Sequence, residues 1–200
     1  MSPAEPQPGQ DRQSLLHWRT VDIVVAAVIG VAVGIVFWVW SVLWNATTGL
    51  FAFFPPAQAI LYGMWMVPGV LGGLIIRKPG AAVLTSIAAA SLEMLLGTGW
   101  GVSVLISGAL QGLLSELVFL AFRYRSWGMG VAVLAGVAGG ISPAIRDNLT
   151  YHVTWPLSYQ VVYGVLVLIS AGLIAGAGSR VLTTRLAAAG ALSPFASARG

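Results

Sequence analysis

The residues with the most informative chemistry in this chain are a few carboxylate and amide side chains within or beside long apolar segments. Glu93, Gln111 and Glu116 interrupt runs of apolar and small residues, and Asp147 follows another such run. A carboxylate in an apolar environment is costly, and where one occurs it usually binds a ligand, pairs with a cation or relays a proton. These four side chains are therefore the first candidates for a ligand-binding site.

Glu93 and Asp147 lie toward the ends of their apolar segments. Glu93 shares its helical face with small residues, which leaves room for a ligand beside the carboxylate. It could instead pair with Arg146 or form a hydrogen bond at a helix end. Asp147 directly follows Arg146, so it could either close an outward-facing binding cup or form an exposed ion pair.

Gln111 and Glu116 share one predicted helix. Ser107 and Ser115 lie four residues to either side of Gln111, so this stripe is predicted to face the other helices. Glu116 is about 140° around an ideal helix from Gln111, and the two side chains need not point the same way. Glu116 therefore fits a structural pair or a relay as well as a ligand contact.

Aromatic residues are frequent in the segment after Asp147. They are Tyr151, His152, Trp155, Tyr159 and Tyr163. Tyr159 and Tyr163 are four residues apart and share one face at the start of the last predicted helix. A single aromatic residue at such a position usually anchors a protein at the membrane interface. Together with carboxylates, however, these residues predict a site for a flat cationic or amino-substituted ring, held by stacking and cation–π contacts.

Motifs for catalysis, metal binding and ATP binding are absent from the sequence. It has no Cys, no H-E-x-x-H motif and only two His, and no Ser, His and Asp fall at a shared depth, so no catalytic or metal site is predicted. Without a G-x-x-x-x-G-K-[ST] motif the chain cannot bind ATP through a phosphate loop.

Two other functional classes stay open. One is a membrane enzyme acting on lipid, for which Glu93 and His152 are the only pair that could act as acid and base. The other is a scaffolding protein, which would leave the acids within the apolar segments unexplained.

These side chains must be positioned by membrane helices. The 200 residues are 58% hydrophobic and only 8% charged, against about 25% charged residues in soluble domains. We predict an all-α integral membrane protein, because the sequence contains six apolar segments that can each cross a bilayer. These segments are residues 22–44, 57–76, 81–96, 101–122, 128–149 and 159–182.

The distribution of basic residues predicts the orientation. With the N-terminus inside, nine of the ten Lys and Arg residues fall on the cytoplasmic side and only Arg146 falls outside, which is the bias of cytoplasmic loops. We therefore expect both termini in the cytoplasm, with a disordered tail over residues 1–18, a membrane domain over residues 19–185 and a second tail over residues 186–200. Since the basic residues lie between apolar runs, no nucleic-acid partner is predicted.

Small residues form a stripe on the first predicted helix. Ala26, Gly30 and Gly34 recur at every fourth position, a spacing that lets another helix approach closely. The stripe could pack within the monomer or form a docking face for a partner subunit.

Three groups of residues carry a resemblance to a known family. They are Tyr62-Gly63-Met64-Trp65 with Ile76-Arg77-Lys78-Pro79-Gly80-Ala81-Ala82, then Glu93-Met94-Leu95-Leu96-Gly97, then Gln111-Gly112-Leu113-Leu114-Ser115-Glu116. In these residues the chain, from about position 22 to 182, resembles the YkoE family, the substrate-binding S components of energy-coupling factor (ECF) transporters for thiamine or its hydroxymethylpyrimidine precursor.

The resemblance implies a six-helix protein of the bacterial inner membrane, without enzymatic activity or a cofactor of its own. It would deliver its ligand by docking on a membrane T component with two ATPase subunits, which use the ATP. Trp65, Glu93, Gln111, Glu116 and Asp147 match the family pattern, so the resemblance implies substrate contacts for them. Another flat, vitamin-like ligand is the alternative on the same fold.

Overall fold

The computed structural model describes residues 17–195 and 197, and over these residues it contains helices and no strands. The predicted tail over residues 1–18 therefore lies outside the described residues except for its last two positions. In chain order the helices are α2 (Thr20–Thr47), the 3₁₀ helices η1 (Thr48–Phe51) and η2 (Pro55–Met66), α3 (Val67–Ile76), α4 (Ala81–Leu95), α5 (Ser103–Ala121), α6 (Met129–Thr150), α7 (Leu157–Ser170), the π-helix η3 (Ala171–Gly178) and α8 (Ser179–Ala188).

The helices have the length and composition of a multi-pass membrane protein. Within the described residues, five helical stretches are long and apolar enough to cross a membrane: 20–51, 55–76, 103–121, 129–150 and 157–188. The shorter apolar helix α4 lies between the second and third of them. Each of the six segments expected from hydropathy thus falls on a helical stretch. Their outward faces carry many exposed apolar side chains, as contact with lipid requires.

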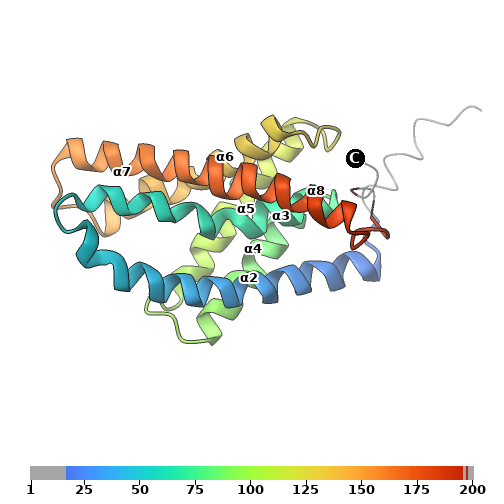
Figure 1. The fold of residues 1–200 in the computed structure, drawn as a ribbon, viewed down its shortest axis with the longest axis horizontal. Coiled ribbons are helices and arrows are strands. Elements are labelled where there is room, and N and C mark those ends of the chain that lie inside the picture. The colour runs from blue at the N-terminus through green and yellow to red at the C-terminus, as the bar shows by residue number, and fades with distance from the viewer. Residues whose placement is uncertain (1–16, 196, 198–200) are drawn as a thin grey trace, which may run out of the picture.

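Helix α3 is the centre of the bundle. It contacts α2, α4, α5, α6 and α8, and every residue from Pro68 to Ile76 is buried. Figure 1 shows α2 along one side of the molecule and α7 with α8 along the other, with α3, α4 and α5 between them. A helix that is apolar on all faces is stable in such a central position.

The small-residue stripe of α2 is covered inside the monomer, which corrects its assignment to partner docking. Ala26, Gly30 and Gly34 are all buried, and α2 packs closely against α4. A Cβ atom added at Gly34 would lie 2.8 Å from the Cβ of Leu92 and 2.9 Å from the carbonyl oxygen of Ala89. The spacing correctly indicates a close helix approach, but the approaching helix belongs to the same chain.

A Gly34→Leu substitution is therefore expected to destabilise the monomer. The added side chain has no space between α2 and α4, and overpacking of this kind costs about 1–3 kcal/mol. The melting temperature in detergent measures the effect, with Val31→Leu on the exposed face of α2 as the matched control. Equal melting temperatures of the two variants would contradict the packing of this stripe against α4.

Most of the basic residues that the structure describes lie at one end of the bundle, formed by the start of α2, the turn between α3 and α4, and the loop between α5 and α6. We call it the basic end. Lys78, between α3 and α4, forms an ion pair with the buried carboxylate of Asp22 at 2.5 Å, and Arg19 pairs with the same carboxylate at 2.9 Å. The guanidinium of Arg77 lies 5.3 Å from the ring centre of Trp127, between α5 and α6. The start of α2, the α3–α4 turn and the α5–α6 loop therefore lie together.

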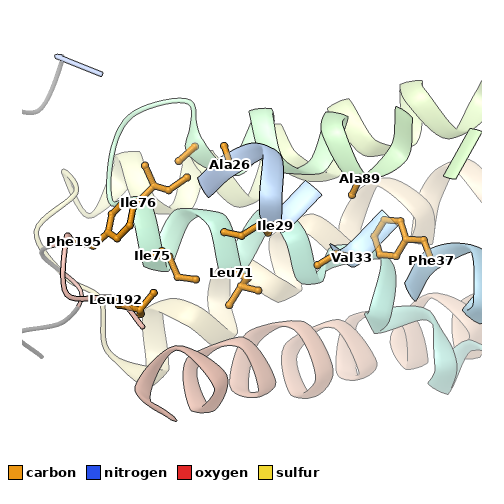
Figure 2. Packing of buried hydrophobic residues seen from close by; sticks show 11 residues of the cluster. Ala26, Ile29, Val33, Phe37, Leu71, Ile75, Ile76, Ala89, Leu192 and Phe195 are labelled. Carbon is orange, nitrogen blue, oxygen red and sulfur yellow. The ribbon is translucent and has the colours of Figure 1, made fainter. Parts of the chain in front are cut away.

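The end of the chain packs against this basic end. The predicted C-terminal tail began at residue 186, whereas the structure continues α8 to Ala188 and buries Leu192 and Phe195. Figure 2 shows these two side chains beside Ile75 and Ile76 of α3. Two isolated apolar residues have no helical period, so hydropathy alone does not reveal that they join the core.

Candidate functional site

A cavity of about 320 Å³ lies at the end of the bundle opposite the basic end. It is lined by the C-terminal halves of α2, α4 and α6, the first halves of α5 and α7, the 3₁₀ helices η1 and η2, and the loops before α5 and after α6. Its volume is at the lower end of the range of about 300–1,000 Å³ for small-molecule sites. The lining residues are Phe37, Trp44, Thr48, Pro55, Gln58, Tyr62, Trp65, Ala90, Glu93, Trp100, Ser103, Val104, Ser107, Gly108, Gln111, Arg146, Asp147, Tyr151, His152, Trp155 and Tyr163.

Helix η2 supplies one aromatic wall. In a 3₁₀ helix residues three apart eclipse each other, so Tyr62 and Trp65 share the face toward the cavity, with ring centres 5.2 Å apart. The ring of Trp44 in α2 packs edge-on against both, at 5.7 and 5.5 Å. Ser170 supports the tight backbone, because its hydroxyl accepts a hydrogen bond from Gly63 N–H at 2.9 Å and donates to the carbonyl of Ile60.

Glu93 is the acid on the α4 side of the cavity. It is 1% exposed, and its Oε1 accepts a hydrogen bond of 2.6 Å from the hydroxyl of Ser41 in α2. Arg146, the alternative partner considered above, instead has its ion pair with Asp147. The side chains of Trp65 and Thr98 also interact with this carboxylate. A carboxylate has about four acceptor sites, so Glu93 keeps capacity to accept hydrogen bonds from a ligand in the cavity.

Asp147 is the second acid of the cavity. Its Oδ2 accepts a 2.8 Å hydrogen bond from the hydroxyl of Tyr163, and Nε of Arg146 lies 3.8 Å from Oδ1. Among the described residues, Oδ1 is buried and has no hydrogen-bond donor. A buried acceptor without a donor is costly, and a donor or cation on a ligand would satisfy it.

The loop after α6 supplies the second aromatic wall, beside Asp147. The imidazole of His152 stacks on Trp155 with ring centres 3.8 Å apart and lies edge-on to Tyr163 at 4.6 Å. Burial lowers the pKa of His152 from its ordinary value, although Asp147 acts in the opposite direction. The lowered pKa favours the neutral imidazole, which does not repel a cationic ligand.

The amide of Gln111 contributes to the floor of the cavity. Gln111 is buried, and Ser107 lines the cavity one turn earlier on α5. Ser115, the third residue of the predicted stripe, lies outside the lining and donates to the carbonyl of Ala135 at 2.9 Å. The stripe thus faces the bundle along its length, but only its first two members reach the cavity.

Glu116 lies at the basic end, not in the cavity, and this corrects its grouping with the ligand-binding residues. Its carboxylate accepts hydrogen bonds from the backbone N–H groups of Gly80 (2.9 Å) and Ala82 (2.8 Å) at the start of α4. The hydroxyl of Tyr124 donates to it at 2.7 Å, and burial with this bond raises the pKa of Tyr124. A carboxylate at a helix N-terminus is stabilising, so the geometry favours the structural alternative.

Tyr159 is also outside the cavity lining, although it shares a helix with Tyr163. Its ring lies 5.3 Å from that of Phe54 and 6.2 Å from that of Trp155. The other predicted residues, Trp65, Glu93, Gln111, Asp147, Tyr151, His152, Trp155 and Tyr163, all line the cavity.

Several lining residues were missed by the sequence analysis. Tyr62 and Gln58 come from the 3₁₀ helix, whose three-residue repeat is not apparent in a hydropathy pattern that was interpreted as an α-helix. Trp44 and Trp100 lie at the ends of predicted apolar segments, where a Trp usually anchors a protein at the membrane interface. The pair Pro55-Pro56 marks the start of this helix, but Pro is also common in the first turn of an α-helix, so it does not indicate the 3₁₀ conformation.

Comparison with known proteins agrees with this architecture. Residues 21–142 match a family model described as "ABC-type cobalt transport system, permease component". A curated relative from Bacillus subtilis (strain 168), named "Putative HMP/thiamine permease protein YkoE", is 33% identical over 180 residues, which cover 90% of this chain and 89% of the relative. This chain belongs to the YkoE family. A solved structure described as "Crystal structure of an S-component of ECF transporter" is 33% identical, covers 92% of each chain and gives a TM-score of 0.86.

Membership in the YkoE family makes the protein a transporter S component and not an enzyme. It also agrees with a location in the bacterial inner membrane. The matching family model mentions cobalt, but among the described residues no group of three or more His, Cys, Asp and Glu side chains could hold a metal ion.

Proposed function

We propose that this YkoE-family protein captures thiamine or its hydroxymethylpyrimidine precursor in the cavity described above. The proposal rests on one observation: two buried carboxylates, those of Glu93 and Asp147, line the same cavity as two groups of aromatic side chains. The name of the Bacillus subtilis relative supports the same ligand class.

Glu93 is the proposed partner of the aminopyrimidine ring. A carboxylate can accept a hydrogen bond from the exocyclic amine and pair with a protonated ring nitrogen, which fixes the orientation of the ring. The rings of Tyr62 and Trp65 provide flat apolar surface near this acid.

Asp147 is the proposed partner of the thiazolium ring of thiamine, which carries a fixed positive charge. Its Oδ1 lacks a donor among the described residues, and the stacked rings of His152 and Trp155 lie beside it. Carboxylate attraction and cation–π contact both favour a cation here. Hydroxymethylpyrimidine lacks the thiazolium and would not use this half of the cavity.

We further propose six membrane crossings with both termini in the cytoplasm. Helix α4 is short, but it begins beside Glu116 at the basic end and carries Glu93 at the cavity end, which supports a sixth crossing. Positive charge accumulates on the cytoplasmic side of membranes. The basic end is therefore assigned to the cytoplasm, and the cavity faces outward.

Transport is proposed to depend on a partner T component and two ATPase subunits, which use the ATP. Accumulation of labelled thiamine or hydroxymethylpyrimidine in cells is expected only when the chain is produced together with these partners. An ATPase variant that cannot hydrolyse ATP is the control and should abolish accumulation. Equal accumulation by the chain alone would contradict the proposal.

A further inference from the structure

A second hollow, separate from the cavity, runs along the outer surface between α5 and α6. It is a shallow groove of about 410 Å³ with apolar side chains on both sides. The residues that line it are Leu114, Leu117, Val118, Ala121, Phe122, Leu134, Val137, Ala138 and Ile141. The groove plays no part in the function proposed above.

The length of the groove matches one leaflet of a bilayer. The lining runs from Leu114 to Phe122, the residue that directly follows α5. These positions are eight residues apart, or about 12 Å at 1.5 Å per residue. The hydrocarbon core of a bilayer is about 30 Å thick, so one leaflet provides about 15 Å. The groove thus extends from the middle of the helices to the basic end, where α5 stops.

Two arginines stand at the basic end of the groove. Arg123 follows Phe122 directly and Arg125 lies two residues further on, and both are exposed. Within the described residues, neither forms an ion pair with an acid, whereas Arg19, Lys78 and Arg146 each form one. Basic residues at the end of an apolar groove between membrane helices favour anionic lipid headgroups.

We propose that this groove binds an acyl chain of an anionic phospholipid whose phosphate is held by Arg123 and Arg125. The apolar lining would contact the acyl chain of the lipid. The two arginines beside it would attract an anionic headgroup. A partner helix would be an apolar occupant of the groove, but it would not by itself account for the two cations.

Native mass spectrometry of the purified protein, titrated with phosphatidylglycerol or with phosphatidylcholine of the same acyl chains, tests the proposal. We expect tighter retention of phosphatidylglycerol by the parent protein. Each single change, Arg123→Gln or Arg125→Gln, should weaken that retention about fivefold, and the double variant about thirtyfold. Arg185→Gln, an exposed cation on α8, is the matched control and should retain the lipid like the parent.

The apolar part of the site has its own variant. Ala138→Trp fills the groove and leaves both arginines in place, so it should release phosphatidylglycerol while the melting temperature confirms that the protein is folded. Four outcomes would overturn the proposal: equal retention of both lipids, unchanged retention by the double arginine variant, unchanged retention by Ala138→Trp, or displacement of the lipid by millimolar inorganic phosphate alone. The last would indicate a site for a free anion.

Discussion

A Glu93→Gln variant is expected to bind its pyrimidine ligand about 10- to 150-fold more weakly than the parent protein, the range for loss of a buried charge-assisted hydrogen bond. The substitution keeps the size of the side chain, and the amide oxygen can still accept the bond from Ser41. What is lost is the negative charge and the second acceptor oxygen for the aminopyrimidine. Glu93→Ala should be at least as severe. Titration of both variants with thiamine and hydroxymethylpyrimidine measures the loss.

The matched control is Glu116→Gln, the same chemical change at the basic end. Because Glu116 caps the start of α4 outside the cavity, this variant should lower the melting temperature and leave the affinity of the folded protein unchanged. If Glu93→Gln and Glu93→Ala both bind as tightly as the parent, or if Glu116→Gln weakens binding as much as they do, the assignment of Glu93 is wrong.

An Asp147→Asn variant is expected to separate the two ligands. Thiamine should bind at least about 5-fold more weakly, since opposite unit charges about 4 Å apart attract by about 1 kcal/mol even in water and by more in a partly buried site. Hydroxymethylpyrimidine, which has no thiazolium charge to lose this attraction, should change less than about twofold. Parallel titrations of one protein sample with both ligands give the ratio directly.

Tyr163→Phe is the control for Asp147→Asn. It removes the hydrogen bond to Oδ2 of Asp147 but keeps the charge, so its effect on the two ligands should be nearly equal. An equal loss for thiamine and hydroxymethylpyrimidine in Asp147→Asn would show that Asp147 does not distinguish the thiazolium, and the proposed orientation of the ligand would then be reversed or abandoned.

The helices could be predicted from the sequence because lipid allows few alternatives. A backbone in hydrocarbon must satisfy its own hydrogen bonds, so each apolar run of sufficient length becomes helical, as the structure shows for all six segments. The exact helix type of individual segments could not be predicted from the sequence. The 3₁₀ helix η2 is hydrogen-bonded through its backbone to Ser170, which comes from a helix more than one hundred residues later in the chain.

The two acids of the cavity could be predicted because a buried carboxylate is costly and therefore informative. The same reasoning failed for Glu116, since the groups that compensate its burial are backbone N–H groups of another helix, and sequence does not show which helix ends meet. Small residues had a similar ambiguity. The stripe at Gly30 and Gly34 predicts a close neighbour, but only the fold identifies this neighbour as α4.

The central claim is that the cavity binds thiamine or its pyrimidine precursor. The most direct test is to purify the protein in detergent from vitamin-depleted cells and titrate it with each compound, following the fluorescence of its eight Trp residues. Trp44, Trp65, Trp100 and Trp155 line the cavity, so we expect saturable quenching by at least one of the two ligands. A folded protein that shows no saturable response to either compound would contradict the claim and leave only the architecture.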